Sequence, residues 1–224
     1  MSAGAGQVKP YSADFMKALG QQMPPGVVAT GKPGEFMIQG VGLRKFADMR
    51  QDVLYDRVEL LAAPGPIAAG TEFVFFRDIQ GKTRLETNMT QSQVLPEGQE
   101  AIIYRINVMA LPETPPEDME LFLSYGYGEF VLDDDLRARS GPLVTFASAY
   151  GAYGNIMTTN TTVVDGTLAN GVPSAGAQPR LMLPLYIAEK RTFRFSIIFY
   201  EAITLSAGLL VYVMLDVLQT RPLR

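Results

Sequence analysis

The chain has 224 residues, of which 47% are hydrophobic, and a formal net charge of −4 at pH 7. It contains no cysteine and no histidine, which excludes disulfides, thiolate or imidazole metal ligands, and catalysis by Cys–His or Ser–His–Asp arrangements. The near-balanced charge argues against a dedicated nucleic-acid-binding protein, which usually carries a basic stripe. We therefore predict no catalytic, cofactor-binding or metal-binding residues, no cofactor, and one all-β domain with a sizeable core.

The first 50 residues are predicted to be an N-terminal arm and lead-in segment, ahead of a β-sandwich over residues 51–224. Gly and Pro recur at close intervals through residues 1–35, and Ser12 is placed to cap a short helix over residues 13–19. Such a segment is either a tail or an arm that becomes ordered on a neighbouring subunit, and we favour the arm. Because no secretory signal is recognisable, we expect the protein to stay in a reducing cytoplasm until release.

The rest of the chain alternates strand-like segments with turns. Strands are predicted for residues 53–61, 71–77, 101–111, 129–133, 142–146, 180–187, 191–199 and 209–218.

A short helix is predicted over residues 119–124, because prolines at 115–116 and acids at 117–118 suit a helix start. Residues 87–96 are polar and loop-like. Residues 147–179 are dominated by small and polar residues, with an excursion at 158–164. A loop of that length in a compact domain is usually functional or contact-forming.

The last two predicted strands are the most hydrophobic. Apolar residues alternate with polar ones through residues 191–199, which is the pattern of a strand with one buried face. Residues 209–218 are apolar at nearly every position, as in a strand buried on both faces or covered by a partner. The alternative is a transmembrane helix over residues 195–218, whose length suits a bilayer. The alternation and the β-branched and aromatic content favour strands.

Few residues are candidates for chemistry. The acids at 133–135 do not converge on one metal ion, because consecutive strand residues point to opposite faces. The acids at 117–118 are the paired carboxylates that an enzyme could use, but acids are common at helix starts. Met and Tyr residues in or beside loops suit contacts between subunits as well as they suit ordinary packing: Met109, Tyr125, Tyr127, Tyr150 and Tyr153.

Eight strands, one short helix and long loops predict an all-β fold, an eight-stranded single jelly-roll sandwich. Several segments between about residues 54 and 222 follow one another in an order and at a spacing that are also found in a known protein family. They are Leu54-Tyr55-Asp56, Phe75-Phe76, Thr87-Asn88-Met89, residues 128–132, 141–146, 191–199 and 209–218, and Arg221-Pro222. In these segments the chain resembles the single jelly-roll major capsid proteins of tailless icosahedral bacteriophages, many of which enclose an internal lipid membrane. That family often has Gly in the last strand where this chain has Asp216, which leaves the register of the strand open.

The resemblance implies a structural virion protein rather than an enzyme. It implies a major capsid subunit that assembles with identical copies into capsomer trimers or higher rings of an icosahedral shell, beside other capsid or penton proteins. The expected location is the virion, assembled in the host cytoplasm. Sequence-specific nucleic-acid binding is not implied, whereas contact with an internal membrane through basic residues such as Lys9, Lys17 or Arg44 is allowed.

Two other functions stay open from the sequence. One is a carbohydrate- or ligand-binding sandwich module, which the Tyr-rich loops allow and the absence of Trp disfavours. The other is a protein anchored in a membrane by its C-terminus, through the alternative helix over residues 195–218.

Overall fold

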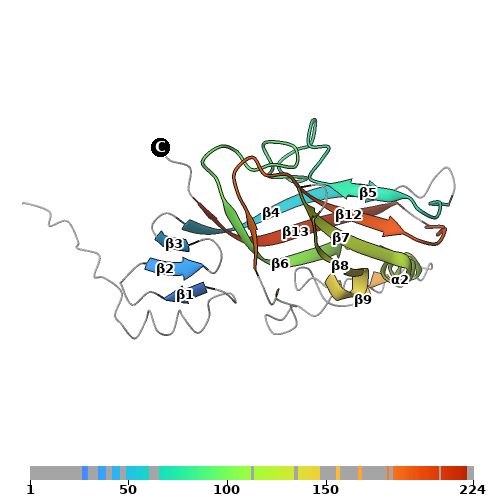
Figure 1. Cartoon of the computed structure of the whole chain (residues 1–224). Helices are drawn as coiled ribbons and strands as arrows, with labels where there is room; N and C mark the ends of the chain where they lie inside the picture. The colour runs from blue at the N-terminus through green and yellow to red at the C-terminus, as the bar shows by residue number, and fades with distance from the viewer. Residues whose placement is uncertain are drawn as a thin grey trace, which may run out of the picture.

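A computed structural model of the chain shows a mostly β protein with two four-stranded antiparallel sheets (Figure 1). It describes residues 27–29, 35–38, 42–45, 49–60, 66–111, 114–133, 136–146, 155–156, 166–167, 181, 184–206 and 208–220. The helix predicted at residues 13–19, the excursion at 158–164 and the dipeptide Arg221-Pro222 lie outside this part. So does the segment 147–179, except for residues 155–156 and 166–167.

The first sheet has the order β11-β6-β13-β4. Its strands are β4 (Met49–Leu60), β6 (Ala101–Ala110), β11 (Leu185–Ile187) and β13 (Leu209–Thr220). The last strand, β13, pairs with β4 over its whole length, from Leu209 opposite Leu60 to Thr220 opposite Met49. Against β6 the register of β13 shifts between Asp216 and Val217, so a bulge lies at the position whose register the sequence left open.

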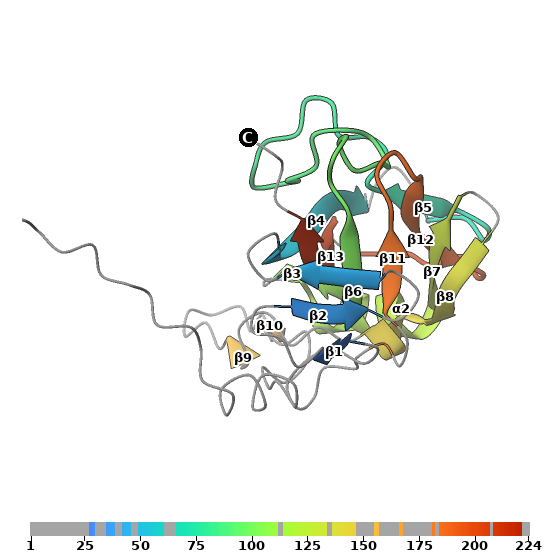
Figure 2. The ribbon, with the colours of Figure 1, turned by 60° about the vertical axis from the view of Figure 1, so that its left-hand side comes forward.

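The second sheet has the order β5-β12-β7-β8. Its strands are β5 (Glu72–Phe75), β7 (Gly126–Leu132), β8 (Leu136–Pro142) and β12 (Phe193–Phe199). Figure 2 looks towards one end of the molecule and shows the two sheets beside each other.

Pairing in the two sheets is nested along the chain. Of their eight strands, the first pairs with the last, β4 with β13, and the second with the seventh, β5 with β12. The third pairs with the sixth, β6 with β11, and the two middle strands, β7 and β8, pair with each other. The sandwich is therefore closed by contacts between residues far apart in the sequence. Its last strand, β13, lies inside the first sheet, between β6 and the first strand, β4, which forms an edge.

One hydrophobic core lies between the two sheets. The alternation predicted for residues 191–199 is confirmed, since Phe193, Phe195, Ile197 and Phe199 are all buried. In β13, Leu209, Val211 and every second residue to Val217 are buried, whereas Leu210, Tyr212 and Met214 on the other face are half-buried. The expected two-layered all-β architecture is thus confirmed, and its inner faces follow the period of two that strands impose.

The predicted helix is confirmed as α2 (Pro116–Tyr125), with Pro at its start and Glu117 and Asp118 in its first turn. The strand predicted at residues 142–146 is wrong: strand β8 ends at Pro142, and a 3₁₀-helix, η2 (Leu143–Phe146), follows. Thr145 Oγ1 donates a hydrogen bond to the Pro142 carbonyl at 2.8 Å. The three-residue spacing of a 3₁₀-helix buries both Leu143 and Phe146.

Two small sheets accompany the sandwich. The strands β1 (Val27–Ala29), β2 (Glu35–Ile38) and β3 (Gly42–Lys45) form an antiparallel sheet within the predicted arm and lead-in segment. The strands β9 (Asn155–Ile156) and β10 (Gly166–Thr167) pair within the predicted long loop. Figure 1 shows β1–β3 beside the end of the sandwich where β4 begins, and α2 at the opposite end.

The alternative transmembrane helix over residues 195–218 is wrong, because these residues form most of β12 and β13. Within the described residues, no helix has the length and apolar character that crossing a bilayer requires.

Candidate functional site

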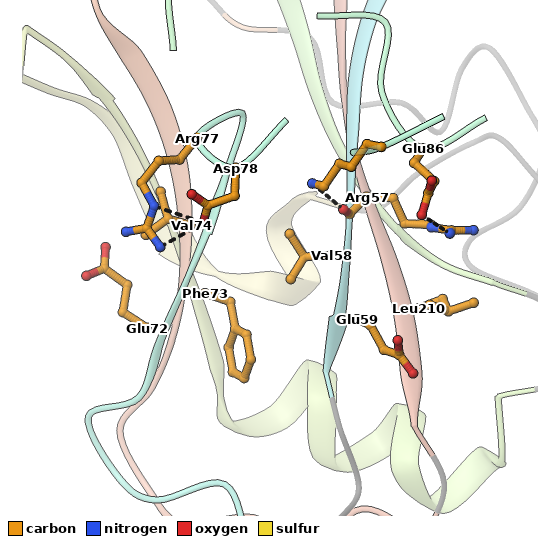
Figure 3. A pocket seen from close by; sticks show the side chains of 11 residues that line it. Arg57, Val58, Glu59, Glu72, Phe73, Val74, Arg77, Asp78, Glu86 and Leu210 are labelled. Atoms are coloured by element: carbon orange, nitrogen blue, oxygen red, sulfur yellow. Dashed lines mark hydrogen bonds and ion pairs between the residues drawn. The ribbon is translucent and has the colours of Figure 1, made fainter. Parts of the chain in front are cut away.

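A hollow on the described surface lies between the edge strands of the two sheets, β4 and β5. Its cavity volume is about 400 Å³. Residues 57–59 of β4 line one wall and residues 72–74 of β5 line the other. Residues 77–86, which we call the segment after β5, supply further charged side chains (Figure 3). We call this hollow the edge groove.

A buried aspartate anchors the edge groove. Asp56 is fully buried in β4, and its Oδ1 accepts a hydrogen bond from Lys82 Nζ at 2.8 Å. Its Oδ2 accepts the backbone N–H of Phe76 at 2.7 Å. Lys82 Nζ also donates to the Arg57 carbonyl at 2.7 Å. A buried carboxylate is tolerated only with such partners, so this network ties the segment after β5 to the edge of β4.

The same network holds an unusual backbone conformation. Phe76 has φ of 67°, in the left-handed region that a bulky residue rarely adopts. Its ring is fully buried and lies 5.4 Å from the ring of Phe193, centroid to centroid. The hydrogen bond to Asp56 and the burial of the ring together offset the backbone strain.

A second charged pair lies beside the first. Glu86 accepts hydrogen bonds from the backbone N–H of Thr83 at 2.8 Å and from its hydroxyl at 2.9 Å, and it also bonds the Arg57 guanidinium. The backbone and side-chain bonds from Thr83, followed by the bond from Arg57, lower the pKa of Glu86 to about 2. For Arg57, burial acts to lower the pKa, but the bond to Glu86 and the proximity of Tyr212 outweigh it, so the pKa of Arg57 is raised.

The basic charges of the edge groove are therefore paired with carboxylates of the same chain, and Glu59 and Glu72 add further acids to its lining. Lys82 is paired with Asp56, Arg57 with Glu86, and Arg77 with Asp78 at 3.0 Å. An incoming anion would have to displace one of these carboxylates. In the part of the chain that the structure describes, no group of three Asp or Glu side chains is placed to hold a metal ion. The edge groove thus has the chemistry of a clamp that joins two sheets.

The sequence-predicted acids do not form a site. Asp118 is buried and accepts the backbone N–H of Ser206 at 2.7 Å and its hydroxyl at 2.9 Å, whereas Glu117 is exposed. Asp133 is exposed and pairs with Arg191. Positions 134 and 135 lie outside the described residues.

A buried polar cluster lies on the outer face of the first sheet. Asp216 is almost completely buried, with Arg105 Nη1 3.7 Å and Asn107 Nδ2 3.5 Å from its Oδ2. These residues are cross-strand neighbours of β13 and β6. Hence the charge that interrupts the last strand is compensated by the adjacent strand, a partner that the local sequence pattern did not reveal.

Two of the predicted contact residues lie at the surface near α2. Tyr125 is exposed at the end of α2, and Tyr127 is half-buried with its ring 5.6 Å from that of Tyr200. Met109 is half-buried on β6, opposite Tyr212 of β13. Tyr150, Tyr153, Lys9 and Lys17 lie outside the described residues, and Arg44 lies on β3.

Sequence reasoning missed Tyr200 and Val144, two of the most exposed apolar side chains among the described residues. Tyr200 directly follows the alternating strand β12 and is out of phase with its buried residues. This break in the alternation could have predicted from the sequence that Tyr200 is exposed.

The chain matches no protein-family model, no curated protein and no solved structure in comparisons with known proteins.

Proposed function

We propose that this chain is a structural virion protein, the major capsid subunit of an icosahedral shell, with a single jelly-roll fold. The observation that carries the proposal is the nested strand pairing: β4 with β13, β5 with β12, β6 with β11 and β7 with β8. Rolling a long hairpin of eight strands into two facing sheets produces this pairing, and viral capsid domains use that architecture. The resemblance of the sequence to single jelly-roll capsid proteins supports the same function.

The chemistry of the edge groove favours this function over a ligand-binding module, although lectin domains share the architecture. The basic side chains that line the groove, Arg57, Arg77 and Lys82, already contact carboxylates of the same chain. An anionic ligand would replace these pairs rather than fill empty sites, which costs desolvation without adding contacts.

In this function the protein acts through contacts with copies of itself, as trimers or higher rings, and with other capsid or penton proteins. Its location is the virion, after assembly in the host cytoplasm. Such a subunit buries roughly 800 Å² against each partner in a contact of standard size, so its exposed apolar surfaces are the functional ones.

The test is the assembly state of the purified chain. We expect sedimentation velocity at increasing protein concentration to show large species, and negative-stain electron microscopy to show regular rings or closed shells. A monomer that persists at high concentration contradicts the proposal. A glycan array on the same preparation provides the comparison, because specific sugar binding by a monomer would favour the ligand-binding module.

A further inference from the structure

Exposed apolar side chains on this molecule gather at two places. Among the described residues, seven large apolar side chains have high exposed fractions, between 41% and 80%. Three lie on the small sheet β1–β3, three lie near α2 and η2, and one, Leu85, stands apart. Scattered exposed apolar residues need no explanation, but clustered ones mark contact surfaces.

The first cluster is a row across the small sheet. Val28 of β1 lies directly opposite Met37 of β2, and Met37 lies directly opposite Leu43 of β3. Directly opposed residues of paired strands project to the same face. These three side chains, which we call the apolar row, are 63%, 47% and 48% exposed.

The second cluster combines side chains from three elements. Tyr125 ends α2, Tyr127 lies in β7 and contacts the ring of Tyr200 just after β12, and Val144 lies in η2. Pro142, opposite Tyr127 on β8, is also exposed. We call Tyr125, Tyr127, Val144 and Tyr200 the tyrosine patch. Tyrosine is enriched in protein interfaces, where its ring adds contact area and its hydroxyl stays hydrated.

The two clusters lie at opposite ends of the molecule. Figure 1 places β1–β3 at the end where β4 begins and α2 at the far end. Two unlike patches at opposite ends are the surfaces of a heterologous contact, in which the head of one subunit meets the tail of the next. We propose that the apolar row of one copy packs on the tyrosine patch of the next copy. This inference rests on the proposed function and names the surfaces through which subunits join.

Charge identifies a second copy as the occupant. Residues 27–45 contain three basic residues, Lys32, Arg44 and Lys45, against one acidic residue, Glu35. The tyrosine patch is flanked by exposed acids at the start of α2 and after β12: Glu117, Glu120 and Glu201. These three acids outnumber Arg139, which bonds the Thr145 carbonyl beside Val144. The net basic segment that carries the apolar row thus complements the more acidic surroundings of the tyrosine patch, and complementary charge favours the correct orientation.

The experiment uses one disrupting substitution in each patch of the full chain. Met37→Asp places a charge at the centre of the apolar row, and Tyr200→Asp places one in the tyrosine patch. Leu85→Asp is the matched control, since Leu85 is 80% exposed and lies in neither patch. Sedimentation equilibrium measures each variant alone and then an equimolar mixture of Met37→Asp and Tyr200→Asp.

We expect each patch variant to be monomeric alone, the control to assemble as the unmodified chain does, and the mixture to form dimers and nothing larger. In the mixture, the intact tyrosine patch of one variant meets the intact apolar row of the other, and the altered patches stop further growth. The result does not depend on whether Met37→Asp disturbs the small sheet, because that copy contributes only its tyrosine patch.

Three outcomes overturn the inference: patch variants that assemble as well as the control, a single variant that dimerises with itself, or a mixture that stays monomeric. If the unmodified chain forms shells and both patch variants do too, this inference fails and the proposed function stands. If the unmodified chain is monomeric at high concentration, both fail.

Discussion

The two sheets of the sandwich fill their shared core with different side chains. The second sheet contributes aromatic rings from β5, β7 and β12: Phe75, Phe130, Phe193, Phe195 and Phe199. The first sheet contributes aliphatic side chains from β4, β6, β11 and β13: Leu54, Leu60, Ile103, Ile106, Val108, Ile187, Val211, Val213, Leu215 and Val217.

This difference indicates which sheet depends on specific ring geometry and which depends mainly on filled volume. We call the second sheet the aromatic sheet and the first sheet the aliphatic sheet. Phe195 makes edge-on ring contacts with Phe75, at 6.2 Å, and with Phe146, at 5.3 Å. Ring contacts of this kind have a preferred geometry and add stability beyond the area they bury. Aliphatic side chains accept substitutes of similar volume at low cost. We therefore expect the aromatic sheet to tolerate change less than the aliphatic one.

The largest expected effect is that of Phe195→Ala. Phe195 is fully buried at the centre of the ring cluster, so the substitution removes a ring and leaves a cavity between Phe75 and Phe146. We expect it to lower the free energy of unfolding by about 4 kcal/mol, measured by urea unfolding with circular dichroism.

The comparison is with Leu215, which is equally buried in β13. Leu215→Ala is expected to cost about 3 kcal/mol, and Leu215→Met about 1 kcal/mol, since it conserves volume. If Leu215→Ala destabilised the protein more than Phe195→Ala, the aromatic sheet would not be the more specific side of the core.

A smaller effect is expected at Gly128, where the aromatic sheet leaves no room. A Cβ at this position would lie 2.7 Å from Cζ of Phe195 and 3.0 Å from Cε2 of Phe146. Both atoms belong to packed rings, so Gly128→Ala should cost about 2 kcal/mol through overpacking. In Gly141→Ala, the matched variant on the neighbouring strand, the new Cβ meets Oγ1 of exposed Thr145 at 3.1 Å. Thermal melting of both variants checks the prediction, and equal shifts in Tm would contradict it.

Local patterns in the sequence predicted most strands of these sheets. Alternation marked β12, and a proline pair followed by acids marked α2. Strand β8 was missed because its sequence, Leu-Arg-Ala-Arg-Ser-Gly-Pro, has few residues with high β-propensity. The strand predicted at residues 142–146 is a 3₁₀-helix instead, in which the buried residues Leu143 and Phe146 are three apart.

What the sequence could not supply is pairing over long distances. The partners of Asp56 are Lys82, 26 residues away, and the backbone of Phe76, 20 residues away. The apolar row exists only because the register sets Val28, Met37 and Leu43 side by side. No period in a local window encodes such contacts, so the edge groove and both patches required the structure.

One substitution on the outer face of the aromatic sheet is expected to stabilise the protein. Ser196 of β12 is buried, and its Oγ has no hydrogen-bond partner among the residues described. A buried hydroxyl without a partner carries a desolvation cost, so Ser196→Ala should raise the free energy of unfolding by about 1 kcal/mol. Ser206→Ala is the control: its hydroxyl bonds Asp118 at 2.9 Å, and its loss should lower stability by about 1 kcal/mol. Urea unfolding that shows both variants destabilised would refute this account of Ser196.

The smallest effect is expected at the edge groove, where charged pairs rather than aromatic or aliphatic side chains join the two sheets. The pKa of Glu86 is about 2 in the folded protein, below its ordinary value of 4.5. A lowered folded-state pKa means that the group stabilises the fold above pH 4.5, and that this contribution is lost as the pH falls towards 2. In Glu86→Gln the stability should therefore fall less steeply over this interval than in the unmodified chain, as judged from urea midpoints at several pH values.

Glu97→Gln separates this effect from general acid destabilisation. Glu97 pairs with Lys190 at 3.3 Å, but both side chains are mostly exposed, and exposed pairs contribute about 0–1 kcal/mol. Its pH profile should follow that of the unmodified chain. If Glu86→Gln also follows it, the bonds from Thr83 and Arg57 do not hold the segment after β5 in place. The two sheets would then be joined at this edge by Asp56 and its partners alone, and the buried network would account for the whole clamp.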